Sequence, residues 1–371
     1  MNPISKAIHE KVDIDGSLPV VTPIFQASAF ESESPFFYTR KNNPNIQEFE
    51  NVVAILEETR FSLSTTTGMS AIHLVLGLLK VRSTLVVNSD IYGCSYKLFQ
   101  KYCEKLEIKL VIIDLSVKEN IKKIPANTSM VVFETPTNPF LKTINIREVS
   151  EFAKANNPDC CIVVDNTWAT PLFQKPIKHG ADVSLHSATK YFSGHSDVMG
   201  GCILTDNENI YNQLHEMRFY QGSILAPYSA WLLRRSLHTL EIRLKHHSET
   251  TSQLKDFLAG HHMIKRVYYP EIDGHQLTGY GTLIFFEFQE KYSEYYREFT
   301  NNLKLFSTGT GMACISSMVA QPYSGSHASL TDAEKEAMGL SKSIIRLSFG
   351  LEFVDDLKYD LSFALLALAD L

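Results

Sequence analysis

The chain has 371 residues, of which 44% are hydrophobic and 20% are charged, and its formal net charge is −6. This length predicts about two domains, and the composition is that of an ordinary globular protein. A mild negative charge without a block of Lys and Arg argues against nucleic-acid binding. No segment approaches the roughly 18 apolar residues of a membrane span, and the N-terminus lacks a signal-peptide pattern. We therefore expect a cytoplasmic protein that binds neither membranes nor nucleic acids.

The cysteines give no indication of a metal site. None of the six belongs to a CxxC pair, and a chain of this size needs no disulfide framework. We therefore predict no zinc site and no other bound metal. The cysteines are Cys94, Cys103, Cys160, Cys161, Cys202 and Cys314.

Residues 1–45 have no strong periodicity, which predicts an extended N-terminal arm. Between residues 46 and 240, short Val/Ile-rich runs alternate with helical patterns. Unbroken apolar strands separated by helices indicate a mostly parallel sheet covered on both faces, in which ligands bind beyond the carboxyl ends of the strands. The predicted strands are 83–87, 109–113, 130–133 and 161–164, and the predicted helices include 70–80 and 146–155.

The pattern changes after about residue 245. Strand-like runs at 281–288 and 344–348 are mixed with helices, which predicts a smaller C-terminal α+β domain on the substrate side. We therefore expect a large domain over residues 46–240 and a second domain over residues 241–371, preceded by the arm.

Lys190 stands in a short run of small and hydroxyl-bearing residues, downstream of a predicted strand that ends in Asp165. This arrangement suits pyridoxal phosphate (PLP). The lysine would bind the cofactor aldehyde, the hydroxyls of Ser187 and Thr189 would hold the phosphate, and the carboxylate would keep the ring nitrogen protonated. A solvated surface lysine would look the same in isolation, so the rest of the chain must decide.

Three other features indicate a binding site, and two of them follow predicted strands. Gly68 and Met69 precede a helical pattern, where free backbone N–H groups bind phosphate, although a simple N-cap has the same appearance. Tyr92 follows a strand and a turn; it could stack on a flat ring or lie on the surface. Asn138 lies in a Pro-rich turn after the strand at 130–133. Residues at the carboxyl ends of neighbouring parallel strands converge, which favours one common site.

With these motifs together, the chain resembles the Cys/Met-metabolism PLP enzymes. These include cystathionine γ-synthase, cystathionine β- and γ-lyases, methionine γ-lyase and O-acylhomoserine sulfhydrylases. The resemblance extends from residues 18–26 to 346–352 and is most specific over 165–201. It implies a type I PLP-dependent transferase fold like that of aspartate aminotransferase. It also implies a homotetramer of two catalytic dimers with shared active sites.

The resemblance further implies a role for each motif residue. Lys190 would carry the cofactor and move protons, Asp165 would pair with the ring nitrogen, and Arg346 would clamp the substrate carboxylate. Tyr92 would stack on the ring and assist proton transfer, provided that neighbouring cations lower its pKa. The implied phosphate ligands are Gly68 and Met69 through their backbone, Ser187, Thr189, and Tyr38 and Arg40 from a neighbouring subunit. The other implied substrate-side residues are Asn138 and Ser317.

Several substrate-side positions depart from the family pattern. Ile46 stands where the family has an arginine, and Ser316 stands where a glutamate usually precedes the serine aligned with Ser317. The loop 309–317 is also longer than usual. These positions concern the choice of substrate and reaction rather than the cofactor.

The sequence therefore predicts a PLP-dependent carbon–sulfur lyase or γ-replacement transferase acting on cystathionine- or homoserine-type amino acids. One alternative is a specialised synthase that joins an O-acylhomoserine to a non-standard nucleophile. Another is a methionine γ-lyase, because Cys94 stands where those enzymes often have a cysteine. A non-catalytic PLP-fold protein is a further alternative, against which the intact motif residues argue.

Overall fold

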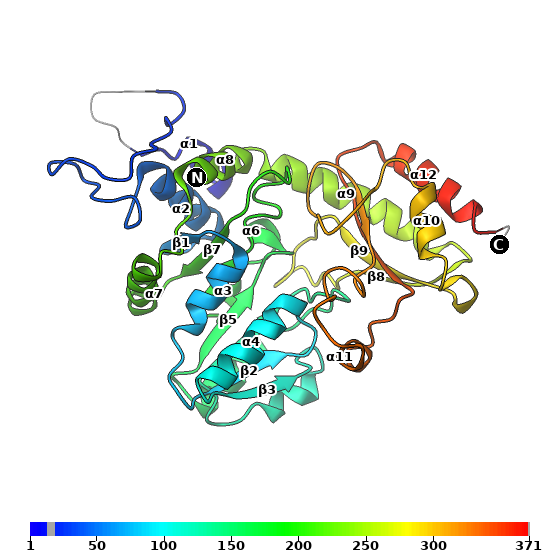
Figure 1. Ribbon diagram of the computed structural model, residues 1–371, viewed down its shortest axis with the longest axis horizontal. Helices are drawn as coiled ribbons and strands as arrows, with labels where there is room; N and C mark the ends of the chain where they lie inside the picture. The colour runs from blue at the N-terminus through cyan, green and yellow to red at the C-terminus, as the bar shows by residue number, and fades with distance from the viewer. Residues whose placement is uncertain (13–18, 370–371) are drawn as a thin grey trace.

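The structure is a computed structural model that describes residues 1–12 and 19–369. Residues 13–18 of the predicted arm, and residues 370–371, lie outside the described part. Figure 1 shows one group of elements around a large sheet and a second group, which includes the C-terminal end of the chain, around a smaller sheet. Within the described residues, no helix is both long and apolar enough to cross a membrane.

The larger sheet has seven strands in the order β1-β7-β6-β5-β4-β2-β3. Only the pairs that include β7 are antiparallel; the other four pairs are parallel. The mostly parallel sheet expected from the Val/Ile-rich runs is therefore confirmed. Its strands are β1 (Phe61–Thr65), β2 (Thr84–Asn88), β3 (Lys109–Ile113), β4 (Met130–Glu134), β5 (Cys161–Asp165), β6 (Val183–His186) and β7 (Gly201–Thr205).

Helices cover both faces of this sheet because its strands are apolar on both sides. On β4, Met130 and Val132 pack with α3, α4 and α7, whereas Val131 and Phe133 pack with α5 on the other face. Successive side chains of a strand point to opposite faces, so one strand contributes to two cores. The covering elements are α3 (Gly68–Leu76), α4 (Gly93–Lys105), α5 (Ile146–Asn156), α7 (Glu208–Gln221) and the 3₁₀ helices η1 (Lys118–Lys123) and η2 (Pro176–His179).

The start of the chain differs from the predicted extended arm, because residues Pro3–His9 form the helix α1. Asn2 caps this helix by accepting a hydrogen bond from the Ile4 N–H at 2.8 Å, and Pro3 suits the first turn. Ala7 is buried in a core cluster that α2 and α8 also supply. The remaining helices of this part are α2 (Pro44–Glu57), α6 (Thr170–Phe173) and α8 (Pro227–Leu237).

The long helix α9 (Leu240–Ala259) leads into a second sheet of five strands in the order β10-β11-β12-β9-β8. Its apolar side chains pack against α9, α10 and α12, which confirms a smaller α+β unit. The domain boundaries themselves stay a prediction. The elements are β8 (Ile264–Tyr268), β9 (Leu283–Phe288), η3 (Glu290–Tyr292), α10 (Tyr296–Asn302), β10 (Ser307–Thr308), β11 (Met318–Ala320), α11 (Asp332–Ala337), β12 (Ile344–Ser348) and α12 (Val354–Leu366).

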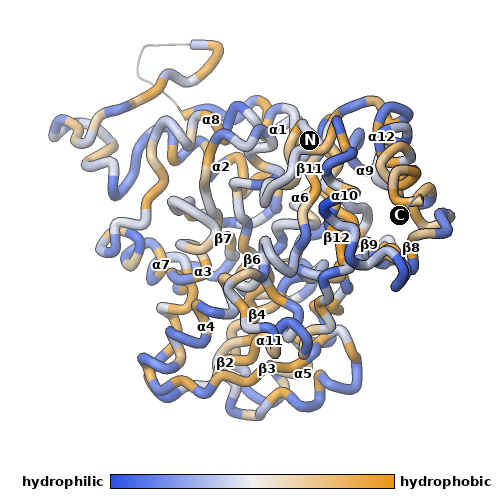
Figure 2. The backbone as a smooth tube through the Cα atoms, turned by 45° about the vertical axis from the view of Figure 1, so that its right-hand side comes forward, coloured by the Kyte–Doolittle hydropathy of each residue, from blue (hydrophilic) through white to orange (hydrophobic). Residues whose placement is uncertain are grey.

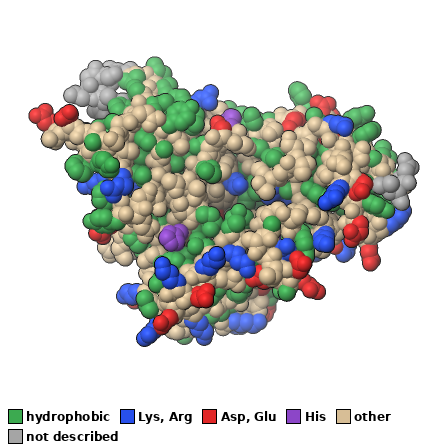
Figure 3. Space-filling view, viewed as in Figure 1, with side chains coloured by type: hydrophobic (Ala, Val, Ile, Leu, Met, Phe, Trp, Pro, Cys, Tyr) green, Lys and Arg blue, Asp and Glu red, His purple; other side chains and the backbone are tan. Residues whose placement is uncertain are grey.

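Hydropathy and charge follow this architecture. In Figure 2 the strands β2, β3 and β4 are mainly hydrophobic. In Figure 3 the Lys and Arg side chains are interspersed with Asp and Glu on the face that is drawn. That face therefore carries both signs of charge and no large block of basic residues.

The start of β7 gives a test of the packing next to α3. A Cβ at Gly201 would overlap the backbone carbonyl of Thr67, the residue that caps α3. We expect Gly201→Ala to lower the free energy of unfolding by about 1–3 kcal/mol because backbone must move to make room. Thermal unfolding measures this change. Gly260→Ala is the matched control, since its nearest atom would lie at 3.6 Å, an ordinary contact. Equal melting temperatures for both variants would contradict the packing.

Candidate active site

The carboxyl ends of neighbouring strands bring four of the sequence-predicted residues to one edge of the large sheet. The strands concerned are β6, β5, β4 and β2, which are adjacent in that order. The last residues of β4 and β5, Glu134 and Asp165, are paired in register. The loops that follow β6, β4 and β2 carry Lys190, Asn138 and Tyr92 respectively.

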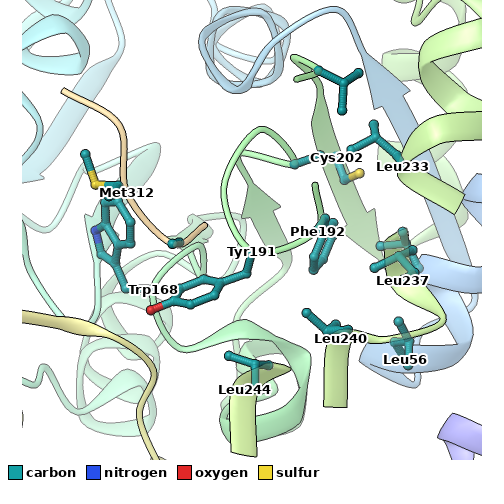
Figure 4. Packing of buried hydrophobic residues seen from close by; sticks show 14 of the residues in the cluster. Leu56, Trp168, Tyr191, Phe192, Cys202, Leu233, Leu237, Leu240, Leu244 and Met312 are labelled. Carbon is teal, nitrogen blue, oxygen red and sulfur yellow. The ribbon is translucent and has the colours of Figure 1, made fainter. Parts of the chain in front are cut away.

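The two aromatic residues that follow Lys190 hold its loop in place. Tyr191 and Phe192 are buried and lie within the hydrophobic core in Figure 4. The Tyr191 hydroxyl accepts a hydrogen bond from the Thr282 N–H at 2.8 Å. The Lys190 N–H donates to the Ser187 carbonyl oxygen at 3.1 Å. The backbone of Lys190 is therefore fixed by its neighbours, while its amine is left for another partner.

The Lys190 side chain lines a cavity of 680 Å³. Residues 310–312, from the loop after β10, form part of the opposite wall. Burial, and next the positive charge of Arg346, lower the pKa of the Lys190 amine from its ordinary value to about 8. More of this amine is therefore neutral near neutral pH than for a solvated lysine.

Arg346 lies in β12 and is almost fully buried, with 2% of its surface exposed. Its Nη2 donates to the carbonyl oxygens of Thr310 and Gly311, both at 3.2 Å, and its Nη1 lies 3.5 Å from the Met312 sulfur. The buried Nε has no hydrogen-bond partner among the described residues. A guanidinium with an unpaired N–H and a weak sulfur partner is suited to bind a carboxylate.

Asp165 presents one carboxylate oxygen that is already bonded and one that is not. Its Oδ1 accepts hydrogen bonds from the N–H of Thr167, at 3.0 Å, and from the Thr167 hydroxyl, whereas Oδ2 has no such partner in the described part of the chain. Burial raises the pKa of Asp165, and Thr167 and His186 oppose this rise. A cation at Oδ2, such as a protonated ring nitrogen, would lower the pKa and favour the carboxylate.

His186 is the last residue of β6, the strand next to the one that ends in Asp165. It is not among the residues that line the Lys190 cavity. Its Nε2 lies 3.0 Å from Glu57 Oε2, and both side chains are buried. The Ser184 hydroxyl donates to the other oxygen of Glu57 at 2.7 Å. The His186–Glu57 pair is buried and hydrogen-bonded, so we interpret it as a structural contact at the end of β6.

The phosphate-binding residues expected from the sequence gather at the start of α3. Gly68 and Met69 form its first turn, whose N–H groups have no intrahelical acceptors. A Cβ at Gly68 would lie 2.9 Å from the Cβ of Ser187, so only glycine allows this approach. The Thr189 hydroxyl is hydrogen-bonded to the backbone of Gly200. Helix N-termini with adjacent hydroxyls are suited to bind phosphate.

Tyr92 caps the start of α4, and its backbone N–H donates to Glu134 Oε1 at 3.0 Å. Burial and a hydrogen bond with Cys94 raise the pKa of the Tyr92 hydroxyl, while Arg346 partly opposes the rise. The expectation that neighbouring cations lower this pKa is therefore wrong for the protein as described. Tyr92 keeps its proton and can act as a proton donor rather than as a base.

Asn138 and Ser317, the other two residues expected on the substrate side, have different environments. The Asn138 N–H donates to Glu134 Oε2 at 3.2 Å, and its buried Oδ1 has no partner among the described residues. The Ser317 hydroxyl donates to Glu352 Oε2 at 2.9 Å and accepts the Gly350 N–H at 2.9 Å. The Ser317 hydroxyl therefore already has hydrogen-bond partners in Glu352 and Gly350. A substrate-binding role for Ser317 stays a prediction.

Tyr38 and Arg40 lie outside the Lys190 cavity of their own chain. Arg40 Nη1 donates to the Phe219 carbonyl oxygen at 2.8 Å, and its guanidinium lies 4.4 Å from the Phe219 ring centroid. Tyr38 is 37% exposed. Both residues border a surface hollow that shares only Ile224 with the cavity. This placement leaves them accessible to a neighbouring subunit.

Comparison with known proteins gives this site a family. The sequence profile described as "Cys/Met metabolism PLP-dependent enzyme" matches residues 5–366. The chain belongs to this family. A cystathionine β-lyase from Lactococcus lactis subsp. cremoris is 34% identical, over 97% of this chain and 98% of the relative. An L-methionine γ-lyase from Fusobacterium nucleatum subsp. polymorphum is also 34% identical, over 91% of each chain.

Solved structures agree with the family assignment. Cystathionine γ-synthase from Xanthomonas oryzae pv. oryzae, in complex with aminoacrylate and cysteine, has a TM-score of 0.94 at 34% identity. That alignment covers 100% of this chain and 99% of the solved one. A cystathionine γ-lyase from Lactobacillus plantarum, complexed with L-serine, has a TM-score of 0.93 at 28% identity and covers 100% of both chains.

The cofactor of this PLP-dependent family fits the residues present. Lys190 has a buried amine of lowered pKa, Asp165 has an oxygen without a partner, and Gly68 leaves room at the start of α3. These three features match the aldehyde, the ring nitrogen and the phosphate of PLP. The donor set therefore suits PLP.

Sequence reasoning was less reliable away from the strand ends. Ile46, which stands where the family has an arginine, is fully buried in the core at the start of α2, a placement that the sequence comparison alone did not reveal. Glu134 was missed, although it accepts the backbone N–H groups of both Tyr92 and Asn138. Its position at the end of a predicted strand was the available signal, but a strand-end acid gives no indication of its partners.

The lowered pKa of Lys190 predicts how the apoprotein takes up PLP. Only a neutral amine attacks an aldehyde, so covalent uptake should accelerate with pH and be half-maximal near pH 8, where half of this amine is neutral. Stopped-flow absorbance of the bound cofactor measures the rate. Arg346→Met should move the midpoint upward because it removes a nearby positive charge, whereas Arg346→Lys should not. A wild-type midpoint near the ordinary lysine value of 10.5 would contradict the structure.

Proposed function

We propose that this protein is a PLP-dependent trans-sulfuration enzyme that cleaves or forms the carbon–sulfur bond of cystathionine- or homoserine-type amino acids. One observation carries the proposal: the amine of Lys190 lines the cavity, and the guanidinium of Arg346 is close enough to lower its pKa. A candidate base and a candidate carboxylate clamp thus lie within electrostatic reach of each other. Membership of the family supports the proposal, as does a cystathionine complex of a related γ-synthase.

The residues divide the chemistry between them. PLP, when bound, supplies an electron sink that makes the α-proton of an amino acid acidic. Arg346 orients the substrate through its carboxylate, which places the α-proton toward Lys190. Lys190, with a pKa of about 8, can remove this proton and return it to another carbon. Asp165 stabilises positive charge at the ring nitrogen, and Tyr92 donates a proton to the departing sulfur.

Two other candidate reactions each have an observation in their favour. The hydrogen bond between Cys94 and the Tyr92 hydroxyl supports methionine γ-lyase activity, because it modifies the group that would meet the leaving thiolate. The lengthened loop supports a γ-replacement synthase using an O-acylhomoserine, because its residues Thr310, Gly311 and Met312 line the same cavity as Lys190. A non-catalytic role is disfavoured by the lowered pKa of Lys190.

The assembly and location belong to the proposal as well. We expect a cytoplasmic homotetramer of two catalytic dimers, in which Tyr38 and Arg40 complete the phosphate site of a neighbouring subunit. Their position outside the cavity of their own chain supports this arrangement. The Arg40 guanidinium contacts Phe219 only through a carbonyl oxygen and the ring, so a phosphate would be a stronger partner.

Product analysis tests the reaction. The holoenzyme is incubated separately with cystathionine, methionine, cysteine and O-acylhomoserines, and the keto acid is identified by mass spectrometry. Pyruvate indicates β-elimination and 2-oxobutyrate indicates γ-elimination; turnover only with an acylhomoserine plus a nucleophile indicates a synthase. Lys190→Ala should abolish every product because it removes the base. Turnover that persists in this variant, or a wild type inactive on all of these substrates, would overturn the proposal.

Mixing two inactive variants tests the shared site. Lys190→Ala and Arg40→Ala damage the same site from different subunits if Arg40 serves its neighbour. Co-refolding the two in equal amounts should restore about a quarter of the wild-type sites, because half of the dimers are mixed and each has one intact site. The activity of the mixture is compared with that of each variant alone. No recovery, with mixed dimers verified by mass spectrometry, would contradict the shared site.

A further inference from the structure

We propose that Glu134 is a positioning residue, whose two carboxylate oxygens hold the backbones of Tyr92 and Asn138 in the geometry that the active site needs. Oε1 accepts the Tyr92 N–H at 3.0 Å, and Oε2 accepts the Asn138 N–H at 3.2 Å. The side chain thus joins the loop after β2 to the loop after β4. The inference rests on the proposed function and deepens it, because it explains how Glu134 positions Tyr92 and Asn138 in that site.

The location of Glu134 explains why one side chain can do this. It is the last residue of β4, which lies between β2 and β5, and only 4% of its surface is exposed. On the β5 side it is paired in register with Asp165. Glu134 therefore lies beside Asp165 and between the two loops, and it is not among the residues that line the cavity.

A carboxylate at this position has no simple substitute. Both N–H groups are backbone donors on different loops, so the side chain must supply two acceptor oxygens at once. A glutamine supplies one oxygen and one NH₂ group, which would face a donor. A buried N–H without an acceptor costs free energy, so one of the two loops would have to move. At the start of α4 the Tyr92 side chain makes no cap hydrogen bond, and its carbonyl oxygen accepts the Tyr96 N–H at 3.0 Å, so Glu134 is the acceptor for its N–H.

Glu134 lies in an environment that is unfavourable for a carboxylate, because it is buried and has other acids nearby. Burial, and then the neighbouring Asp165, raise the pKa of Glu134 well above its ordinary value, and the N–H groups of Tyr92 and Asn138 oppose the rise. Asp90 adds a further negative charge nearby, and that acid is paired with Lys142 at 2.8 Å. A residue that served only to fill space would be apolar here, since burying an acid beside other acids is costly.

The consequences are specific to the active site. Tyr92 is close enough to Arg346 for each to affect the pKa of the other, so a shift of the loop after β2 would reach both the cofactor ring and the carboxylate clamp. Displacement of a positioned group by about 1 Å can reduce catalysis about a hundredfold. Loss of the Glu134 contacts should therefore affect the site more than it affects the fold.

The test compares Glu134→Gln with Glu50→Gln. Glu50 is also a buried carboxylate that accepts a backbone N–H, from Ser64 at 2.7 Å, but it lies near Arg218 and away from the cavity. Four quantities are measured on PLP-loaded protein: the melting temperature, the circular dichroism of the bound cofactor, kcat and KM. The dichroism reports the asymmetric environment of the ring and needs no turnover.

We expect Glu134→Gln to change the cofactor dichroism and to lower kcat/KM by about ten- to a hundredfold, because Tyr92 or Asn138 leaves its position. Glu50→Gln should lower the melting temperature but leave the dichroism per bound cofactor and KM near their wild-type values. If Glu134→Gln instead behaves like the control, with unchanged dichroism and KM, Glu134 is merely structural and the inference is overturned.

The two proposals can fail separately. A wild type that turns over no sulfur amino acid, combined with altered dichroism in Glu134→Gln, would overturn the proposed function and support the positioning role. Should the glutamine variant fail to fold, Glu134→Asp serves in its place. This variant keeps the carboxyl but shortens the side chain by one methylene, so it cannot reach both N–H groups, and the same changes are expected.

Discussion

Two basic side chains, Lys190 and Arg346, lie close enough for the charge of Arg346 to lower the pKa of the Lys190 amine, and the arrangement of the site depends on this unfavourable proximity. Burial and the guanidinium lower the pKa of the amine to about 8, which turns an inert ammonium into a usable base and nucleophile. Such a pair needs anions for compensation. In a PLP-dependent enzyme, the phosphate of the cofactor and the carboxylate of the substrate would provide them.

The scaffold keeps this arrangement rigid from both sides. On the side of the large sheet, Tyr191 and Phe192 anchor the Lys190 loop in the core. The backbone of Lys190 is therefore fixed, and the amine changes position only by rotation about the bonds of the lysine side chain. On the other side, Arg346 lies on a central strand of the second sheet and is tied to the carbonyl groups of Thr310 and Gly311. A substrate carboxylate would therefore meet a guanidinium that is already oriented, which lowers the entropic cost of binding.

The carboxyl ends of the parallel strands explain why a few side chains can organise the rest. Asp165 and Glu134 are neighbours because β5 and β4 are paired in register, although they lie far apart in the sequence. Asp165 has a carboxylate oxygen without a partner among the described residues, and Glu134 joins two loops. Glu134 is buried and Asp165 is partly buried, the pKa of each is raised, and a protonated ring nitrogen would compensate the charge of Asp165.

The sequence by itself determined the mostly parallel sheet and the family, and it placed the candidate site residues after the strands, because Val/Ile-rich strands and the residues that follow them are local patterns. The apolar run at 109–113 and the strand at 344–348 fall where they were predicted. The tertiary structure alone decided what depends on contacts between distant segments. Burial and Cys94 raise the pKa of Tyr92 instead of lowering it, and Ile46 belongs to the core. Likewise, Glu134 bonds two loops that no local pattern connects, since hydrogen-bond partners and local dielectric arise only when the chain has folded.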